Sequence, residues 1–226
     1  MTKKQKSRDR APLTRESVLH AAVRLADENG IETLSMRKLA QALGVEAMSL
    51  YNHVANKDDV LDGMVDIVVG QIERPKIGGD WRTAMRHRAN SAYEVLLDHP
   101  WAPLLIVSRI HVGPAMLRYV DATIGCLREA GFSFDQVDRA WNFIDSHIYG
   151  FALQQMHFPI DPTEYASAAD AFLPMIPVDR YPYLHALSLR VIDGSHAGTQ
   201  DFEFGLDLIL DGLERIRVRD CGDVAP

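Results

Sequence analysis

Residues 35–54 read SMRKLAQALGVEAMSLYNHV, a pattern that predicts two short helices joined by a tight turn. Ser35 is a preferred N-cap residue, and the apolar residues after it follow the spacing of one helix face. These apolar positions are Met36, Leu39, Ala40 and Leu43. Gly44 supplies a stop, and a second helix is expected over Glu46 to Val54. Two helices connected in this way are typical of a helix-turn-helix.

The second of these helices has an outer face rich in hydrogen-bonding groups. If Val45, Leu50 and Val54 point inward, a hydroxyl, a phenol, an amide and an imidazole remain outside. They belong to Ser49, Tyr51, Asn52 and His53, beside the small Ala47. Such groups bind base edges and phosphates in the DNA major groove. The alternative is a three-helix packing unit without a DNA role, which does not explain why the Lys and Glu usual on an exposed face are missing here.

The rest of the chain is expected to be helical, because no stretch alternates apolar and polar residues for long enough to predict a strand. A first helix begins after Thr14 and ends at Gly30, which is expected in the left-handed helical conformation. Further helices are expected over 56–73, 80–99, 102–110, 113–130, 135–156 and 202–217. We therefore predict an all-α fold, with an N-terminal three-helix head followed by a helical bundle. The expected boundaries are a basic arm at 1–12, the helix-turn-helix domain at 13–57, the bundle at 58–219 and a tail at 220–226.

The charge of the chain is distributed unevenly. The net charge is −7, which would disfavour nucleic acid if it were spread evenly. Residues 1–57, however, contain ten Lys or Arg and six Asp or Glu, whereas residues 58–226 contain 14 and 25. The head is therefore the part of the chain that attracts DNA. The basic arm is expected either to lie along the DNA backbone or minor groove, or only to aid solubility.

The length and composition of the chain are those of an ordinary globular protein. The chain has 226 residues and 47% hydrophobic content, enough for one or two compact domains. No apolar run approaches the roughly 18 residues that span a bilayer, and no signal peptide is recognisable at the start. Two cysteines, Cys126 and Cys221, indicate no disulfide framework. These features predict a cytoplasmic protein.

Several short motifs of the head resemble the TetR family of bacterial repressors. They are Ser35-Met-Arg37-Lys-Leu39-Ala40, Leu43-Gly44-Val45, Leu50-Tyr51-x-His53-Val54 and Asn56-Lys57-Asp58-Asp59. The segment from Phe202 to Glu214 resembles the last helix of the tetracycline-repressor branch. The resemblance implies a homodimer on a palindromic operator, with residues 58–219 forming the ligand-binding and dimerisation domain. It also implies that helices 135–156 and 202–217 pair with their symmetry mates in a four-helix bundle, with Leu206 and Leu213 in the seam.

The resemblance assigns roles to residues of the head. Arg37 is placed at a phosphate or guanine edge, Lys57 at a phosphate, and Tyr51 and His53 at the DNA backbone. Ala47, Met48 and Ser49 open the recognition helix and are expected at base edges, Ala47 or Met48 against a thymine methyl. Asn52 is expected to pair with adenine.

The ligand site departs from that of the tetracycline repressors, which bind a drug–magnesium complex through a histidine of the sixth helix. Here the comparable stretch, 104–107, reads LLIV, and the counterparts of other drug-binding positions are Glu73, Arg88 and Ala92. We therefore expect a lipophilic ligand and no cofactor or metal. The candidate ligand-binding residues are Trp101, Ile106, Arg109, Met116, Trp141, His147, Phe151 and Gln154. Each of these residues is alternatively a core residue.

Two other functions remain as alternatives. The first is a DNA-binding regulator controlled by a protein partner instead of a small molecule. The second is an enzyme or carrier with a vestigial head, which the sequence disfavours because it has no HExxH, CxxC pair, GxSxG, P-loop or dinucleotide-binding motif.

Overall fold

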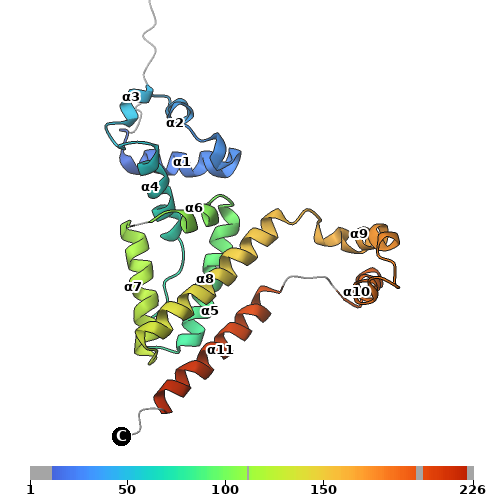
Figure 1. The fold of residues 1–226 in the computed structure, drawn as a ribbon. Coiled ribbons are helices and arrows are strands. Elements are labelled where there is room, and N and C mark those ends of the chain that lie inside the picture. The colour runs from blue at the N-terminus through green and yellow to red at the C-terminus, as the bar shows by residue number, and fades with distance from the viewer. Residues whose placement is uncertain (1–11, 111, 197–200, 223–226) are drawn as a thin grey trace, which may run out of the picture. The chain divides into compact units, whose positions relative to one another are not determined.

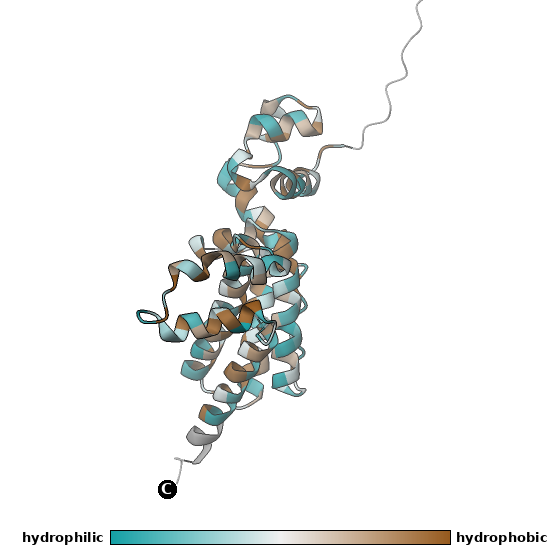
Figure 2. Cartoon of the chain, turned by 90° about the vertical axis from the view of Figure 1, so that its right-hand side faces the viewer, coloured by the Kyte–Doolittle hydropathy of each residue, from teal (hydrophilic) through white to brown (hydrophobic). Residues whose placement is uncertain are grey.

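The computed structural model describes residues 12–110, 112–196 and 201–222, and within them all regular structure is helical. The chain forms two compact units, which meet in sequence between Ser133 and Phe134. The first unit contains α1 to α7 and the second contains α8 to α11 (Figure 1). Most helices carry hydrophobic residues on one side and hydrophilic residues on the other (Figure 2), the pattern of helices that pack against a core.

The first unit begins with three helices whose ends are set by local signals. They are α1 (Arg15–Asn29), α2 (Met36–Leu43) and α3 (Ala47–Leu50), with a 3₁₀ turn at Ile31–Thr33. The Thr14 side chain caps α1 by accepting a hydrogen bond from the backbone N–H of Ser17. The Ser35 side chain caps α2 in the same way through the N–H of Lys38. Gly44 ends α2 in the left-handed conformation, φ 61° and ψ 40°, which only glycine adopts without strain.

Four longer helices complete the first unit. They are α4 (Lys57–Val69), α5 (Trp81–Asp98), α6 (Ala102–Ser108) and α7 (Pro114–Glu129). Helix α4 packs against α1 as well as against α5, α6 and α7. Met64, Val65 and Val68 are fully buried, as expected for a helix in contact with several others. Helix α4 therefore runs from the end of α3 into the centre of this unit.

The second unit is built on two long helices, α8 (Phe134–His157) and α11 (Phe202–Gly222). They pack on each other through Ile144, Ile148, Leu206 and Leu210, all fully buried. Between them in sequence lie α9 (Tyr165–Phe172) and α10 (Pro182–Ile192), which pack together, with short 3₁₀ turns at Pro162–Glu164 and Leu173–Met175.

The all-α prediction is confirmed, with three corrections of detail. Helix α3 is shorter than predicted, because residues 51–53 continue it as turns whose N–H groups bond three residues back instead of four. Helices α9 and α10 were not predicted individually. Gly30 ends α1 with φ 80° and ψ 148°, a glycine conformation outside the left-handed helical region. The arm at 1–11 and the tail from 223 lie outside the described residues, and the predicted domain boundaries stay predictions.

The prediction that Leu206 and Leu213 lie in the interface between subunits is wrong. Leu206 is fully buried and Leu213 is 4% exposed within a single chain, because they face α8 of their own subunit. Side chains already covered in this way are not available to a partner subunit. Exposed apolar side chains on these helices include Phe143, Phe204 and Leu208, which are 59–63% exposed.

Candidate DNA interface and ligand-binding residues

A small apolar core on the inner side of the helix-turn-helix fixes its two helices against each other. Leu39, Leu50 and Val54 are at most 2% exposed. The N–H of Val45 donates to the carbonyl of Ala40 across the turn, with an N···O distance of 3.0 Å. Because these inner side chains fix α3 against α2, the opposite side of α3 is turned to the outside.

The predicted DNA-contacting residues form the outer side of this motif. Met48 is 76% and Tyr51 45% exposed, unusual for large side chains of a small domain. Asn52 is exposed as well, and the remaining recognition residues, Ala47, Ser49 and His53, are half-buried. Arg37 and Lys57 are exposed at the beginning of α2 and α4. All eight residues are therefore accessible in part or fully, and their contacts with DNA stay predictions.

An ion pair that sequence reasoning missed fixes the end of the recognition segment. Arg15 donates to both carboxylate oxygens of Asp59, at 2.5 and 2.7 Å, and to the backbone carbonyl of His53 at 3.3 Å. Asp59 also accepts from the N–H of Ala55 at 2.8 Å. Arg15 therefore ties the first turn of α1 to the first turn of α4 and to the last residues of the recognition segment. The two partners are 44 residues apart, so no local pattern signals the pair.

We expect this ion pair to make the stability of the head sensitive to acid. Arg15 holds the pKa of Asp59 below its ordinary value of 3.8 by hydrogen bonding, against a smaller opposing effect of burial. A lowered pKa stabilises the folded state above the pKa of the unfolded chain, and this stabilisation is lost as the pH falls through the folded value. Because the pair is partly exposed, its contribution is about 0.2–1 kcal/mol.

The measurement is urea unfolding at pH 6 and pH 3. Asp59→Asn should lower the free energy of unfolding at pH 6 and remove part of the loss that the wild type shows at pH 3. Glu28→Gln, at an exposed position of α1, is the control and should leave both values unchanged. Equal loss between the two pH values in Asp59→Asn and wild type would contradict the assignment.

Further polar contacts connect α4 with the segment around α6 and α7. Arg109, which ends α6, donates to Asp62 at 2.8 Å and to Asp58 at 3.0 Å. One carboxylate oxygen of Asp66 accepts from the backbone N–H groups of Ala115 and Met116, both at 2.9 Å, and so caps α7 from a neighbouring helix. Three carboxylates on α4 are thus engaged by the residues that flank the α6–α7 connection.

The candidate ligand residues of the first unit have different surroundings. Trp101 is 5% exposed, and its indole N–H donates to Asp27 at 2.6 Å. Arg109 is engaged by the α4 carboxylates. Ile106 and Met116 are half-buried on α6 and α7. Trp101 and Arg109 therefore have structural partners, and a ligand-binding role of these four residues stays a prediction.

Two of the candidate ligand residues of the second unit, His147 and Phe151, contact Phe202 at the start of α11. His147 stacks on Phe202 with ring centroids 4.8 Å apart, and Phe151 meets Phe202 edge-on at 5.5 Å. His147 Nε2 lies 2.9 Å from the carbonyl oxygen of Phe202. A carbonyl only accepts, so this nitrogen carries the proton. Trp141 donates to Asp145 at 2.5 Å, while Gln154 is exposed. His147, Phe151 and Phe202 form an aromatic cluster that sequence reasoning anticipated only in part.

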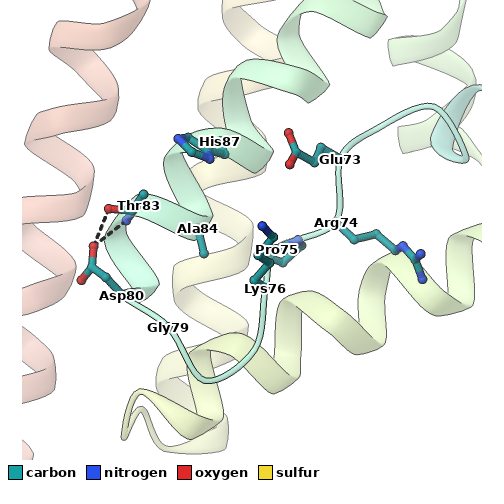
Figure 3. A pocket seen from close by; sticks show the side chains of 9 residues that line it. All are labelled: Glu73, Arg74, Pro75, Lys76, Gly79, Asp80, Thr83, Ala84 and His87. Carbon is teal, nitrogen blue, oxygen red and sulfur yellow. Dashed lines mark hydrogen bonds between the residues drawn. The ribbon is translucent and has the colours of Figure 1, made fainter.

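A cavity of about 260 Å³ in the first unit lies between the α4–α5 connection and the first turns of α5 (Figure 3). Its lining residues are Glu73, Arg74, Pro75, Lys76, Gly79, Asp80, Thr83, Ala84 and His87. Asp80 accepts from the backbone N–H and the hydroxyl of Thr83, at 2.9 and 2.6 Å, and so caps α5. Arg74 extends away from His87 and Thr83 in Figure 3. None of the predicted ligand residues lines this cavity, although Glu73 was noted as the counterpart of a drug-binding position.

The other two such counterparts lie inside the first unit. Arg88 is fully buried, and its guanidinium carbon lies 4.8 Å from the centroid of the Tyr119 ring, the geometry of a cation–π interaction. Ala92 is 1% exposed. Within the described residues, no group of three or more His, Cys, Asp or Glu side chains is arranged to hold a metal ion. No helix in the described part of the chain is long and apolar enough to cross a membrane.

Comparison with known proteins identifies both parts of the chain. Residues 18–64 match the model of bacterial regulatory proteins of the tetR family, and residues 74–217 match that of the tetracyclin repressor-like C-terminal domain. The HTH-type transcriptional repressor DrrR1 of Streptomyces coeruleorubidus is 33% identical over 95% of this chain and 82% of its own. The class D tetracycline repressor protein of Escherichia coli is 32% identical over 90% of each chain.

A solved structure agrees with these matches. The Streptomyces coelicolor TetR family protein ActR, in complex with actinorhodin, has a TM-score of 0.77 and 28% identity over 92% of this chain and 99% of its own. The predicted resemblance is thus confirmed, and with it the function of a DNA-binding regulator instead of an enzyme. The chain belongs to the TetR family of bacterial transcriptional regulators.

Proposed function

We propose that the protein is a dimeric repressor that binds a palindromic operator in the cytoplasm and leaves it when a small lipophilic ligand binds. The observation that carries the DNA-binding role is the outer side of α3 and of the turns that follow it. There Met48, Tyr51 and Asn52 are exposed, while the inner side chains of the motif are buried. One such segment reads only a few base pairs. Two subunits on two half-sites multiply the discrimination against other sequences.

We place the dimer interface on the exposed sides of α8 and α11. Phe143, Phe204 and Leu208 are large apolar side chains that a second copy would cover. A Cβ atom built at Gly150 or Gly212 meets nothing within 4 Å in the single chain, so the backbone is open to close approach there. Together these features suit a helix pair that packs against its symmetry mate.

We propose that the ligand binds without magnesium. Where tetracycline repressors have drug-binding side chains, this chain has an exposed Glu73, a fully buried Arg88 and the small Ala92. The half-buried apolar candidates Ile106, Met116, Trp141 and Phe151 suit a lipophilic molecule. The complex of ActR with actinorhodin supports a small-molecule ligand for this chain as well.

The proposed mechanism is an equilibrium between two conformations. Ligand binding favours the conformation in which α4 moves, and α4 begins three residues after Val54, where the recognition segment ends. Arg109 and Asp66 bond α4 to the residues that flank the α6–α7 connection, so a displacement of that connection is transmitted to α4. Such coupling requires only that the ligand bind the two conformations with different affinity.

The test begins with duplexes selected from a random-sequence library by the wild-type protein. We expect a palindromic consensus, and a screen of lipophilic compounds by thermal unfolding should identify a ligand. At 100 times its dissociation constant, a ligand stabilises the native state by about 2.7 kcal/mol. The stabilisation and the release of the selected duplex should be the same with EDTA. Loss of release upon chelation would refute the magnesium-independent ligand, and a non-palindromic consensus would refute the dimeric operator.

A further inference from the structure

One carboxylate oxygen in the first unit connects α1 to the α5–α6 corner, and through that corner to a residue that follows α4. Asp27 Oδ1, in the last turns of α1, lies 2.6 Å from the indole nitrogen of Trp101 and 2.8 Å from Nδ1 of His99. The other ring nitrogen of His99 lies 3.1 Å from the amide nitrogen of Gln71, just after α4. His99 ends α5 and Trp101 precedes α6. We call these four residues the Asp27 cluster.

The donors and acceptors of the Asp27 cluster form a consistent chain. A carboxylate only accepts, so Trp101 Nε1 and His99 Nδ1 both donate to Asp27. His99 Nε2 accepts from the Gln71 amide when the ring is neutral, and donates to the amide oxygen, 3.4 Å away, when the ring is charged. Because the amide offers both groups, the contact with Gln71 is available in either protonation state of His99. The two bonds to Asp27 are unaffected by this change.

Burial distinguishes this cluster from the other contacts to the head. His99 is 8% and Trp101 5% exposed, and the side chain of Asp27 is 26% exposed. Asp58 and Asp62, the partners of Arg109, have side chains that are 72% and 47% exposed. Salt screens an exposed ion pair much more than a buried one. The bonds of the Asp27 cluster therefore hold α1 at ionic strengths that weaken the contacts of Arg109.

The cluster also crosses the boundary between the two family domains. Asp27 lies within residues 18–64, the part matched as the DNA-binding domain, whereas His99 and Trp101 lie within residues 74–217. Both donors sit at the α5–α6 corner, so a displacement of α6 moves the partners of α1. We propose that Asp27 is a positioning residue that couples the α5–α6 corner to the DNA-binding head through its bonds with His99 and Trp101. This proposal rests on the proposed function.

Coupling is reciprocal, so it can be measured from the DNA side without knowing the ligand. The probe is the duplex selected by the wild-type protein, and the readout is hydrogen exchange of backbone amides in the full-length protein. Adding duplex to wild type should slow exchange in α2 and α3, and also in α6. In α6 we expect the duplex to slow amide exchange by a factor of roughly 5 to 150, the range of typical coupling between sites.

The variants separate the hydrogen bonds from a general loss of structure. Asp27→Ala should keep the slowing in α2 and α3 and lose it in α6. Asp27→Asn should behave as wild type, because its amide oxygen still accepts from both donors. Trp101→Phe, which retains a buried ring but lacks the N–H, should reduce the α6 effect in part and serves as the second test if Asp27→Ala does not fold.

Each outcome decides the proposal. Unchanged slowing of α6 in Asp27→Ala or in Trp101→Phe would overturn it, as would a wild type that selects a duplex but shows no slowing in α6. An Asp27→Asn variant that behaves as Asp27→Ala would overturn the role of the hydrogen bonds. A wild type that selects no duplex would instead refute the proposed operator-binding function, and the coupling proposal with it.

Discussion

Replacing Phe204 and Leu208 together by glutamate is expected to convert the dimer into monomers and to abolish operator binding. Both side chains are about 60% exposed in the single chain, at 63% and 59%. Burying a Phe or Leu side chain is worth about 1.5–3 kcal/mol, and symmetry counts each residue twice. Because only about 60% of each side chain remains to be buried, the loss is about 4–7 kcal/mol before the cost of placing four carboxylates in an apolar interface.

Sedimentation at micromolar concentration and titration of the selected duplex measure the two effects. Phe204→Leu with Leu208→Met is the matched control, because it keeps apolar side chains at both positions and should remain a dimer. Circular dichroism should show the glutamate variant to be folded, since neither side chain belongs to the buried contact between α8 and α11. A glutamate variant that sediments as the wild-type dimer would exclude this interface.

The second large effect concerns DNA binding, in which Asn52 is expected to contact a base and Lys57 a phosphate. Asn52→Ala should lower the ratio of specific to non-specific affinity by about 1–3 kcal/mol for each lost base contact. With two subunits on a palindrome the change is about 2–6 kcal/mol, or roughly 30-fold and more. Lys57→Ala should instead weaken binding to every duplex and reduce the slope of log K against log salt by about 0.9 for each phosphate contact, or about 1.8 for the dimer.

Fluorescence anisotropy with the selected duplex and a scrambled duplex, over a series of salt concentrations, separates the two signatures. Asn29→Ala is the control for Asn52→Ala, because Asn29 is an exposed amide at the end of α1. Lys76→Ala, in the exposed connection after α4, is the control for Lys57→Ala. If the specific ratio and the salt slope both stay at wild-type values in the two variants, α3 does not read DNA in the proposed way.

Much of the head was predictable because its signals are local. The N-caps Thr14, Ser35 and Asn56 each accept a backbone hydrogen bond from a residue three positions later, and Gly44 ends α2 in the conformation that its lack of a Cβ permits. Such signals act within one helical turn, so the sequence contains them in full. The exact length of α3 was not predictable, because 3₁₀-type and α-type turns share nearly the same pattern.

The ligand site was less predictable than the head. Aromatic and Met residues at helical spacing were taken as candidate pocket residues, yet Trp101 is bonded to Asp27 and His147 to the backbone of Phe202. The same apolar pattern serves a core and a pocket, because both need side chains removed from water. Periodicity alone therefore gives the buried side of a helix without saying what is buried against it.

The sequence by itself determined the all-α fold, the helix-turn-helix and the family. Only the tertiary structure decided that Leu206 faces its own subunit, that Arg15 holds Asp59, and that Asp27 binds His99 and Trp101. The two members of the pairs Arg15–Asp59, Asp27–His99 and Asp27–Trp101 are 44, 72 and 74 residues apart along the chain. Pairs at such separations depend on how whole helices pack, which no capping residue or hydrophobic period encodes.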